Sequence, residues 1–283
     1  LETWFVYRPY IVQQAREGKG PLRWFYQALS LGSDDLSEKA MSYDRKWIFT
    51  LAVIGIPSAH GLHGYIGFVF GSLKAREWWS SDLMPLVFLF SAIISGTALL
   101  IAIYVLSCRL RKVPVDLPCL KGMAYALWGF MMFTLLLEGV EFASLVYRGR
   151  EGIEIIMEYV RGPLLITFFF LQFGLGSVVP LSALSYMIWR GTTGRALVVG
   201  VTTSAALVLF AVLMMRWNVV IGGQEISKTG KGLVDYQPTV LGREGLLAAA
   251  ALVVMPLILL LLAVKLFPPW EKRLTPSSAG NAP

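Results

Sequence analysis

Six stretches of this sequence each run for about 20 residues or more with few charged side chains, the length that a helix needs to cross the hydrocarbon core of a bilayer. The chain is 56% hydrophobic and 15% charged, whereas soluble domains carry roughly a quarter charged residues. The sequence therefore predicts an all-α integral membrane protein with about six transmembrane helices, and it excludes a soluble domain. The predicted spans are residues 47–73, 83–107, 120–147, 163–189, 196–215 and 246–267.

The chain divides into three segments by composition. Residues 1–46 are polar and mixed, and we expect them to form a cytoplasmic segment that follows a missing or truncated N-terminal span, because the chain begins with Leu1. Residues 47–267 are predicted to form the transmembrane domain. Residues 268–283 are rich in proline, serine and glycine, and we expect a disordered cytoplasmic tail.

Lysine and arginine are unevenly distributed between the two sides of the membrane. Sixteen of the 25 basic residues fall on the side that holds residues 1–46 and the C-terminus, and nine fall on the other side. Basic loops tend to stay in the cytoplasm. The sequence therefore predicts a multi-pass protein of the cytoplasmic (inner) membrane with a cytoplasmic C-terminus. The net charge of +7 is then mainly an orientation signal and does not indicate nucleic acid binding.

A few polar side chains lie inside the predicted spans, where ionisable groups are costly and mark functional sites by default. His60 and His63 are three residues apart on the first span, so they share a face, and Glu138 and Glu141 do the same on the third. With Gln172 in the fourth span, they lie at depths that allow them to converge. Each also has a structural interpretation, as a hydrogen-bonded helix contact or a solvated interface residue.

Redox cofactors held by this chain are not predicted. Two histidines one turn apart on one helix cannot bind a haem from both faces, and Cys108 and Cys119 are too few for an iron–sulfur cluster or a zinc site. Nucleotide and flavin motifs are also missing from the sequence. Quinone chemistry fits this pattern, because a quinone takes up two protons with two electrons, and the electrons can come from another subunit.

Three runs of residues carry a resemblance to a known family. Residues 56–76 read IPSAHGLHGYIGFVFGSLKAR, residues 83–100 read LMPLVFLFSAIISGTALL, and residues 216–224 read RWNVVIGGQ. Together they resemble the NrfD polysulphide reductase membrane-subunit family, in particular its ten-helix branch of HybB-like and DsrP-like subunits. The continuation at residues 225–232 is most similar to the DsrP-like subunits of sulfur and sulfate metabolism.

The resemblance implies a ten-helix fold of two four-helix bundles, and a quinone-interacting or quinol-interacting membrane subunit of a respiratory oxidoreductase complex. It implies menaquinone or another quinone as the bound substrate, no haem in this subunit, a ferredoxin-like iron–sulfur subunit on the periplasmic side, and further cytochrome and membrane subunits. The predicted roles are quinone binding for His60 and His63, proton relay for Glu138, Glu141 and Gln172, and partner docking for Arg216, Asn218 and Gln224.

Two other functions stay open on the sequence alone. Charges in mid-membrane and helix-breaking glycine and proline also suit a secondary transporter, although no inverted repeat is evident. A purely structural membrane anchor of a redox complex would explain the spans, but it would leave the ionisable side chains in lipid without a role. No catalytic residue and no metal ligand is predicted.

Overall fold

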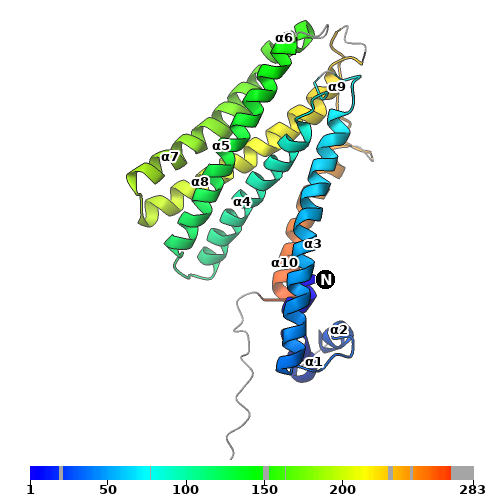
Figure 1. Cartoon of the computed structure of the whole chain (residues 1–283), viewed down its shortest axis with the longest axis vertical. Helices are drawn as coiled ribbons and strands as arrows, with labels where there is room; N and C mark the ends of the chain where they lie inside the picture. The colour runs from blue at the N-terminus through cyan, green and yellow to red at the C-terminus, as the bar shows by residue number, and fades with distance from the viewer. Residues whose placement is uncertain are drawn as a thin grey trace, which may run out of the picture. The chain divides into compact units, whose positions relative to one another are not determined.

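The computed structural model describes residues 1–18, 22–76, 78–148, 153–162, 164–228, 232–242 and 245–268. These residues are predominantly helical, and their only β-type pairing is an isolated antiparallel bridge between Ile226 and Leu233 (Figure 1). The chain forms two compact units, Leu1–Ala59 with Pro238–Pro283, and His60–Gln237. The tail predicted to be disordered falls, except for Pro268, outside the described residues.

Four long helical stretches of the larger unit pack side by side as a bundle (Figure 1). The third stretch begins as a π-helix, and the fourth passes through a short π-helical turn near its end, so both contain wider turns than an α-helix. The stretches are α4 (Met84–Leu110), α5 (Leu117–Arg148), η1 (Leu165–Val178) continued by α7 (Val179–Arg190), and α8 (Gly194–Trp217) continued by η2 (Asn218–Gly222) and α9 (Gly223–Glu225).

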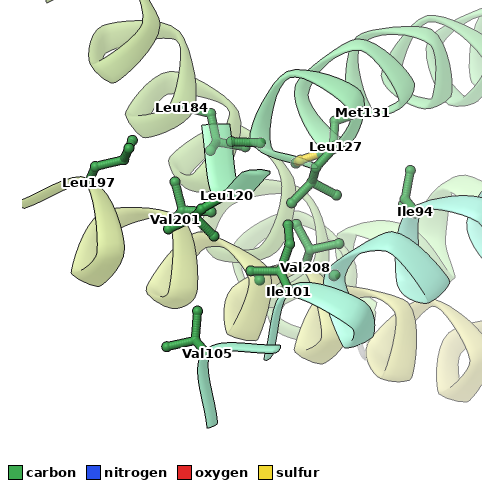
Figure 2. Close-up of a cluster of buried hydrophobic side chains, with 13 residues drawn as sticks. Ile94, Ile101, Val105, Leu120, Leu127, Met131, Leu184, Leu197, Val201 and Val208 are labelled. Carbon is green, nitrogen blue, oxygen red and sulfur yellow. The ribbon is translucent and has the colours of Figure 1, made fainter. Parts of the chain in front are cut away.

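An apolar core joins these helices (Figure 2). Ile101 of α4, Leu120 and Leu127 of α5, and Val201 of α8 have no exposed surface, and Leu184 of α7 has almost none. The bundle therefore has a dry, close-packed interior over much of its length, and polar side chains inside it stand out against this background.

A short amphipathic helix, α6 (Ile153–Arg161), connects α5 to η1. Its apolar residues recur at the spacing of one helix face, and Ile156, Tyr159 and Val160 on that face are buried against Leu164 and Ile226. The sequence analysis did not predict α6, because nine residues are too few to register as a span.

The smaller unit contains the first part of α3 and three further helices. The Arg8 guanidinium forms a buried ion pair with Asp44, with Nε and Oδ2 2.7 Å apart, and the Tyr26 hydroxyl donates to the Leu266 carbonyl at 2.7 Å. The helices are α1 (Glu2–Glu17), α2 (Leu22–Leu29), α3 (Glu38–Gly71) and α10 (Leu246–Leu266). Two helices thus form within the segment predicted only as polar and mixed.

Five helices are long and apolar enough to cross a membrane by length and composition: Met84–Leu110, Leu117–Ser144, Leu165–Arg190, Gly194–Glu225 and Leu246–Leu266. They confirm the predicted all-α, multi-pass membrane class. The sixth predicted span lies in α3, which is 34 residues long but is not among the five. Pro57, His60, His63 and several glycines make this helix less apolar than the others.

Candidate functional site

A small polar cavity lies between the helices of the bundle. Glu138 of α5 and Gln172 of η1, which the sequence places at compatible depths, both line it. The space open to water-sized molecules is about 20 Å³, enough for about one water molecule. The cavity walls are otherwise mostly apolar, with three hydroxyl groups from Ser91, Thr134 and Ser177.

The three hydroxyls of the cavity all donate their protons to backbone carbonyls of their own helical stretches. A serine or threonine hydroxyl has one proton and two lone pairs, so a hydroxyl whose proton is used in this way can only accept from its other neighbours. The bonds are Ser91 Oγ to Phe88 O at 2.9 Å, Thr134 Oγ1 to Phe130 O at 2.9 Å, and Ser177 Oγ to Gln172 O at 3.3 Å.

Gln172 is paired with Asn218, and both side chains are buried. The Asn218 Nδ2 group donates to Gln172 Oε1 at 2.9 Å, while Asn218 Oδ1 has no hydrogen-bond partner among the described residues. Gln172 lies in η1 and Asn218 begins η2, so each amide comes from a π-helical stretch. Wide turns of this kind are frequent at functional sites, since they change the direction in which a side chain projects.

Arg216 brings a positive charge next to the cavity. Its Nη2 donates to the Ser91 hydroxyl at 2.7 Å, and its guanidinium carbon lies 4.0 Å from the centre of the Phe88 ring. Among the described residues, no carboxylate forms an ion pair with Arg216. The guanidinium is therefore stabilised inside the bundle by a hydroxyl and an aromatic face.

The remaining sequence-predicted residues lie outside the cavity. Glu141, one turn after Glu138 on α5, is hydrogen-bonded to Ser81. His60, which is exposed, and His63, which is half-buried, lie on α3, and neither lines the cavity. The cavity thus combines two of the three predicted proton-relay residues but not the predicted quinone-binding pair.

A second polar cluster surrounds α9, and its centre is Arg76 in the segment between α3 and α4. Arg76 Nη1 donates to the carbonyls of Gly223, Gln224 and Ile226 at 2.8, 3.1 and 2.6 Å, and Nη2 donates to Gln224 Oε1 at 2.9 Å. Its guanidinium also lies 5.5 Å from the Trp79 ring centre. Arg76 therefore satisfies the carbonyls that the end of a helix leaves without partners.

The same cluster ties α6 to α9. The Tyr159 hydroxyl donates to Glu225 Oε2 at 2.5 Å. Burial raises the pKa of the Tyr159 hydroxyl, and the hydrogen bond and negative charge of Glu225 raise this pKa further. The sequence analysis missed this contact, which spans 66 residues, although the apolar spacing of Ile156, Tyr159 and Val160 could have indicated α6.

The residues predicted to dock a partner fall in two environments. Asn218 is 1% exposed and Arg216 is half-buried beside Ser91, so both lie within the bundle. Gln224 lies at the α9 end, where its side-chain oxygen binds Arg76. The docking role of all three stays a prediction.

Comparison with known proteins gives one family and two relatives. The sequence matches the family described as "Polysulphide reductase, NrfD" over residues 16–227. It is 28% identical over 287 aligned positions to the C subunit of selenate reductase from Mesobacillus selenatarsenatis, an alignment that covers 96% of this chain and 65% of that protein. It is 28% identical over 199 positions to a Halobacterium salinarum protein named as the membrane C subunit of a dimethyl sulfoxide reductase, covering 70% of this chain and 44% of that protein. The chain thus spans less than two thirds of either relative's length.

Proposed function

Since this chain belongs to the NrfD family of polysulphide reductase membrane subunits, we propose that it is the quinone-reacting membrane subunit of a multi-subunit respiratory oxidoreductase. The observation that carries the proposal is the polar cavity of Glu138 and Gln172, with Arg216 beside it, inside a bundle of membrane helices. Ionisable groups at such positions are retained for a pathway or a site. Both relatives are named as C subunits of reductases, which supports a role within a larger complex.

The proposed reaction separates electrons from protons. A quinone, menaquinone being our first candidate, takes two electrons from an iron–sulfur partner subunit, and each of its two carbonyl oxygens takes one proton to give the quinol. Oxidation of the quinol reverses both transfers. We propose that His60 and His63 hold the quinone oxygens and exchange these protons. The cavity, with room for about one water molecule, is too small for a quinone ring, so we assign it to the protons.

In this proposal Glu138, Gln172 and Glu141 carry protons through the bundle. Glu138 and Gln172 share the cavity, and Glu141 lies one turn further along α5. A carboxyl group and a water molecule can pass a proton between them at hydrogen-bond distance. A transporter role would need a larger binding site than this cavity, whose size favours the proton role.

The docking surface for the iron–sulfur partner is proposed at the α9 end, on the periplasmic side, with the C-terminus in the cytoplasm. Of the three residues predicted for docking, Gln224 is the one that lies at this end outside the bundle interior. Arg76 fixes the backbone from Gly223 to Ile226, so a partner would meet a rigid surface. A rigid surface loses less conformational entropy on binding than a mobile loop.

The substrate of the whole complex belongs to another subunit. The similarity of residues 225–232 to DsrP-like subunits and the named selenate and dimethyl sulfoxide reductase relatives support a role in the reduction of sulfur or selenium compounds. Cytochrome and further membrane subunits are proposed as additional partners.

The test is quinol-dependent turnover of the purified complex with His60→Leu. Loss of a proton-transferring group costs about 100-fold or more in rate, so we expect at least that loss while the complex stays assembled. Ser58→Ala is the matched control, because Ser58 lies on the same helix and its hydroxyl only bonds the Ile54 carbonyl. Unchanged turnover in His60→Leu, with the control also unchanged, would refute the quinone role and leave a structural anchor.

A further inference from the structure

We propose that Asn218 is a positioning residue of the cavity: it holds the Gln172 amide in the orientation that presents its NH₂ group to Glu138. The inference rests on the proposed proton role of Glu138. It assigns Asn218 a function inside the bundle, distinct from the partner docking that its place in the sequence suggested. The structural basis is the hydrogen bond from Asn218 Nδ2 to Gln172 Oε1 at 2.9 Å.

The orientation of Gln172 follows from this hydrogen bond. A glutamine amide has an accepting end and a donating end, and Asn218 occupies the accepting end. The NH₂ group of Gln172 is therefore the end left for the cavity that Gln172 and Glu138 line together. Asn218 is 1% exposed, so water cannot compete for the Gln172 oxygen from that side.

The hydroxyls of the cavity make this orientation matter. Ser91, Thr134 and Ser177 donate their protons to backbone carbonyls and can offer only lone pairs to Glu138. Among the described residues that line the cavity, Gln172 thus provides the one side-chain N–H donor. An ionised carboxylate needs donors, whereas a protonated carboxyl group needs an acceptor, so the orientation of Gln172 sets which form of Glu138 is favoured.

Charged groups near Glu138 come from two helices. Glu141 lies one turn away on α5, and Arg216 of α8 is held at Ser91, which lines the same cavity. The lining residues of α4, η1 and α7 are uncharged. Substitution of Asn218 leaves Glu141 and Arg216 in the chain, so a change in the titration of Glu138 can be traced to the amide pair.

Without Asn218, the Gln172 amide can turn its oxygen toward the cavity, and Glu138 then finds an acceptor in place of a donor. We therefore expect Asn218→Leu to move the midpoint of Glu138 protonation upward by about one pH unit, a tenfold change in proton affinity. Gln172→Leu, which removes the same donor, should give a shift of the same sign and size. The double variant should shift no further than either single variant, because both act on one contact.

The experiment is an infrared pH titration of the carboxyl C=O band in the full chain, reconstituted in lipid nanodiscs. The band of Glu138 is identified by its loss in Glu138→Gln. Thr202→Val is the control, since Thr202 lies on the same helix as Arg216 and its hydroxyl bonds the Val198 carbonyl. Asn218→Ser, whose hydroxyl is too short to reach Gln172, is the second variant if Asn218→Leu fails to assemble, and the same upward shift is expected.

Two results would overturn the inference. The first is an unshifted midpoint in the Asn218 variants when Gln172→Leu shifts it, which would mean that Gln172 needs no positioning. The second is additive shifts in the double variant, which would mean that the two amides act independently. The titration uses no quinone, so its outcome is separate from the proposed function, which the turnover of Glu138→Gln and His60→Leu tests.

Discussion

Gly176 of η1 and Ala211 of α8 approach so closely that a Cβ atom added at Gly176 would overlap the Ala211 side chain. Both residues line the polar cavity, so the absence of a side chain at position 176 sets the distance between two of its walls. Small residues allow this kind of close helix packing in membranes.

Gly176→Ala is therefore expected to push η1 and α8 apart and to cost about 1–3 kcal/mol of stability, the usual penalty of overpacking. Thermal unfolding in detergent micelles measures the effect. Gly129→Ala is the matched control, because a Cβ atom at Gly129 of α5 meets nothing within 4 Å. Equal unfolding temperatures for the two variants would show that the bundle absorbs the extra methyl group.

Phe88→Leu should destabilise the bundle by removing the aromatic face on which Arg216 lies. A desolvated cation–π contact contributes about 2 kcal/mol, so we expect a loss of that size beyond the effect of the smaller side chain. The comparison is with Phe130→Leu, whose ring is 37% exposed on α5. If both variants unfold at the same temperature, the ring of Phe88 contributes packing alone.

Arg76→Gln is expected to release the α9 backbone. Four hydrogen bonds from one guanidinium hold Gly223, Gln224 and Ile226, and hydrogen bonds to charged groups contribute about 1.5–3 kcal/mol each. Hydrogen exchange of the amides between 223 and 228 should rise by a factor of ten or more, since about 1.4 kcal/mol already corresponds to tenfold. Lys74→Gln, an exposed neighbour, should leave exchange unchanged. Protection retained in Arg76→Gln would mean that the segment is held by other contacts.

Tyr159 makes stability depend on alkaline pH. Its pKa is raised in the folded chain above the usual value of about 10, so the folded state holds the phenol proton more tightly than the unfolded state. This contribution is complete below pH 10 and is lost as the pH rises above it. Tyr159→Phe should flatten the fall in unfolding temperature above pH 10, whereas Tyr147→Phe, at a 92% exposed position, should keep the wild-type profile. An unchanged slope in Tyr159→Phe would contradict the assignment.

Asp44→Asn should destabilise the unit formed by α1, α2 and the start of α3. Arg8 would keep a buried charge without its carboxylate, and breaking a buried pair in this way costs about 3–5 kcal/mol. The double variant Arg8→Met with Asp44→Leu should recover much of the loss, because it removes both charges. Thermal unfolding compares these variants with Asp34→Asn, an exposed aspartate of the same unit. A double variant that is less stable than Asp44→Asn would contradict this view.

Apolar length predicted most of the membrane helices to within a few residues. The expected spans 83–107, 120–147 and 246–267 correspond to α4, α5 and α10. Short helices such as α6 escaped prediction, because their stability comes from contacts with distant segments. Ile156 and Val160 reveal a helix face only once Leu164 and Ile226 are known to cover it.

The site was predictable in its residue types and less so in its contacts. Helix depth correctly paired Glu138 with Gln172, because both groups lie in long apolar spans whose depth can be counted from the ends. The Asn218–Gln172 bond was out of reach, since it depends on two π-helical stretches that change the direction of both side chains. The contact of Arg76 with α9 likewise joins residues about 150 positions apart.

The self-satisfied hydroxyls of the bundle bear on how it enters the bilayer during synthesis. Helices whose serine and threonine protons already bind their own carbonyls can leave the translocon singly, without waiting for a neighbour. The helix that carries Arg216 and Asn218 is different, because both of these groups require partners. Their partners Ser91, Phe88 and Gln172 all precede it in the chain, so the ribosome has already delivered them when this last helix of the bundle emerges.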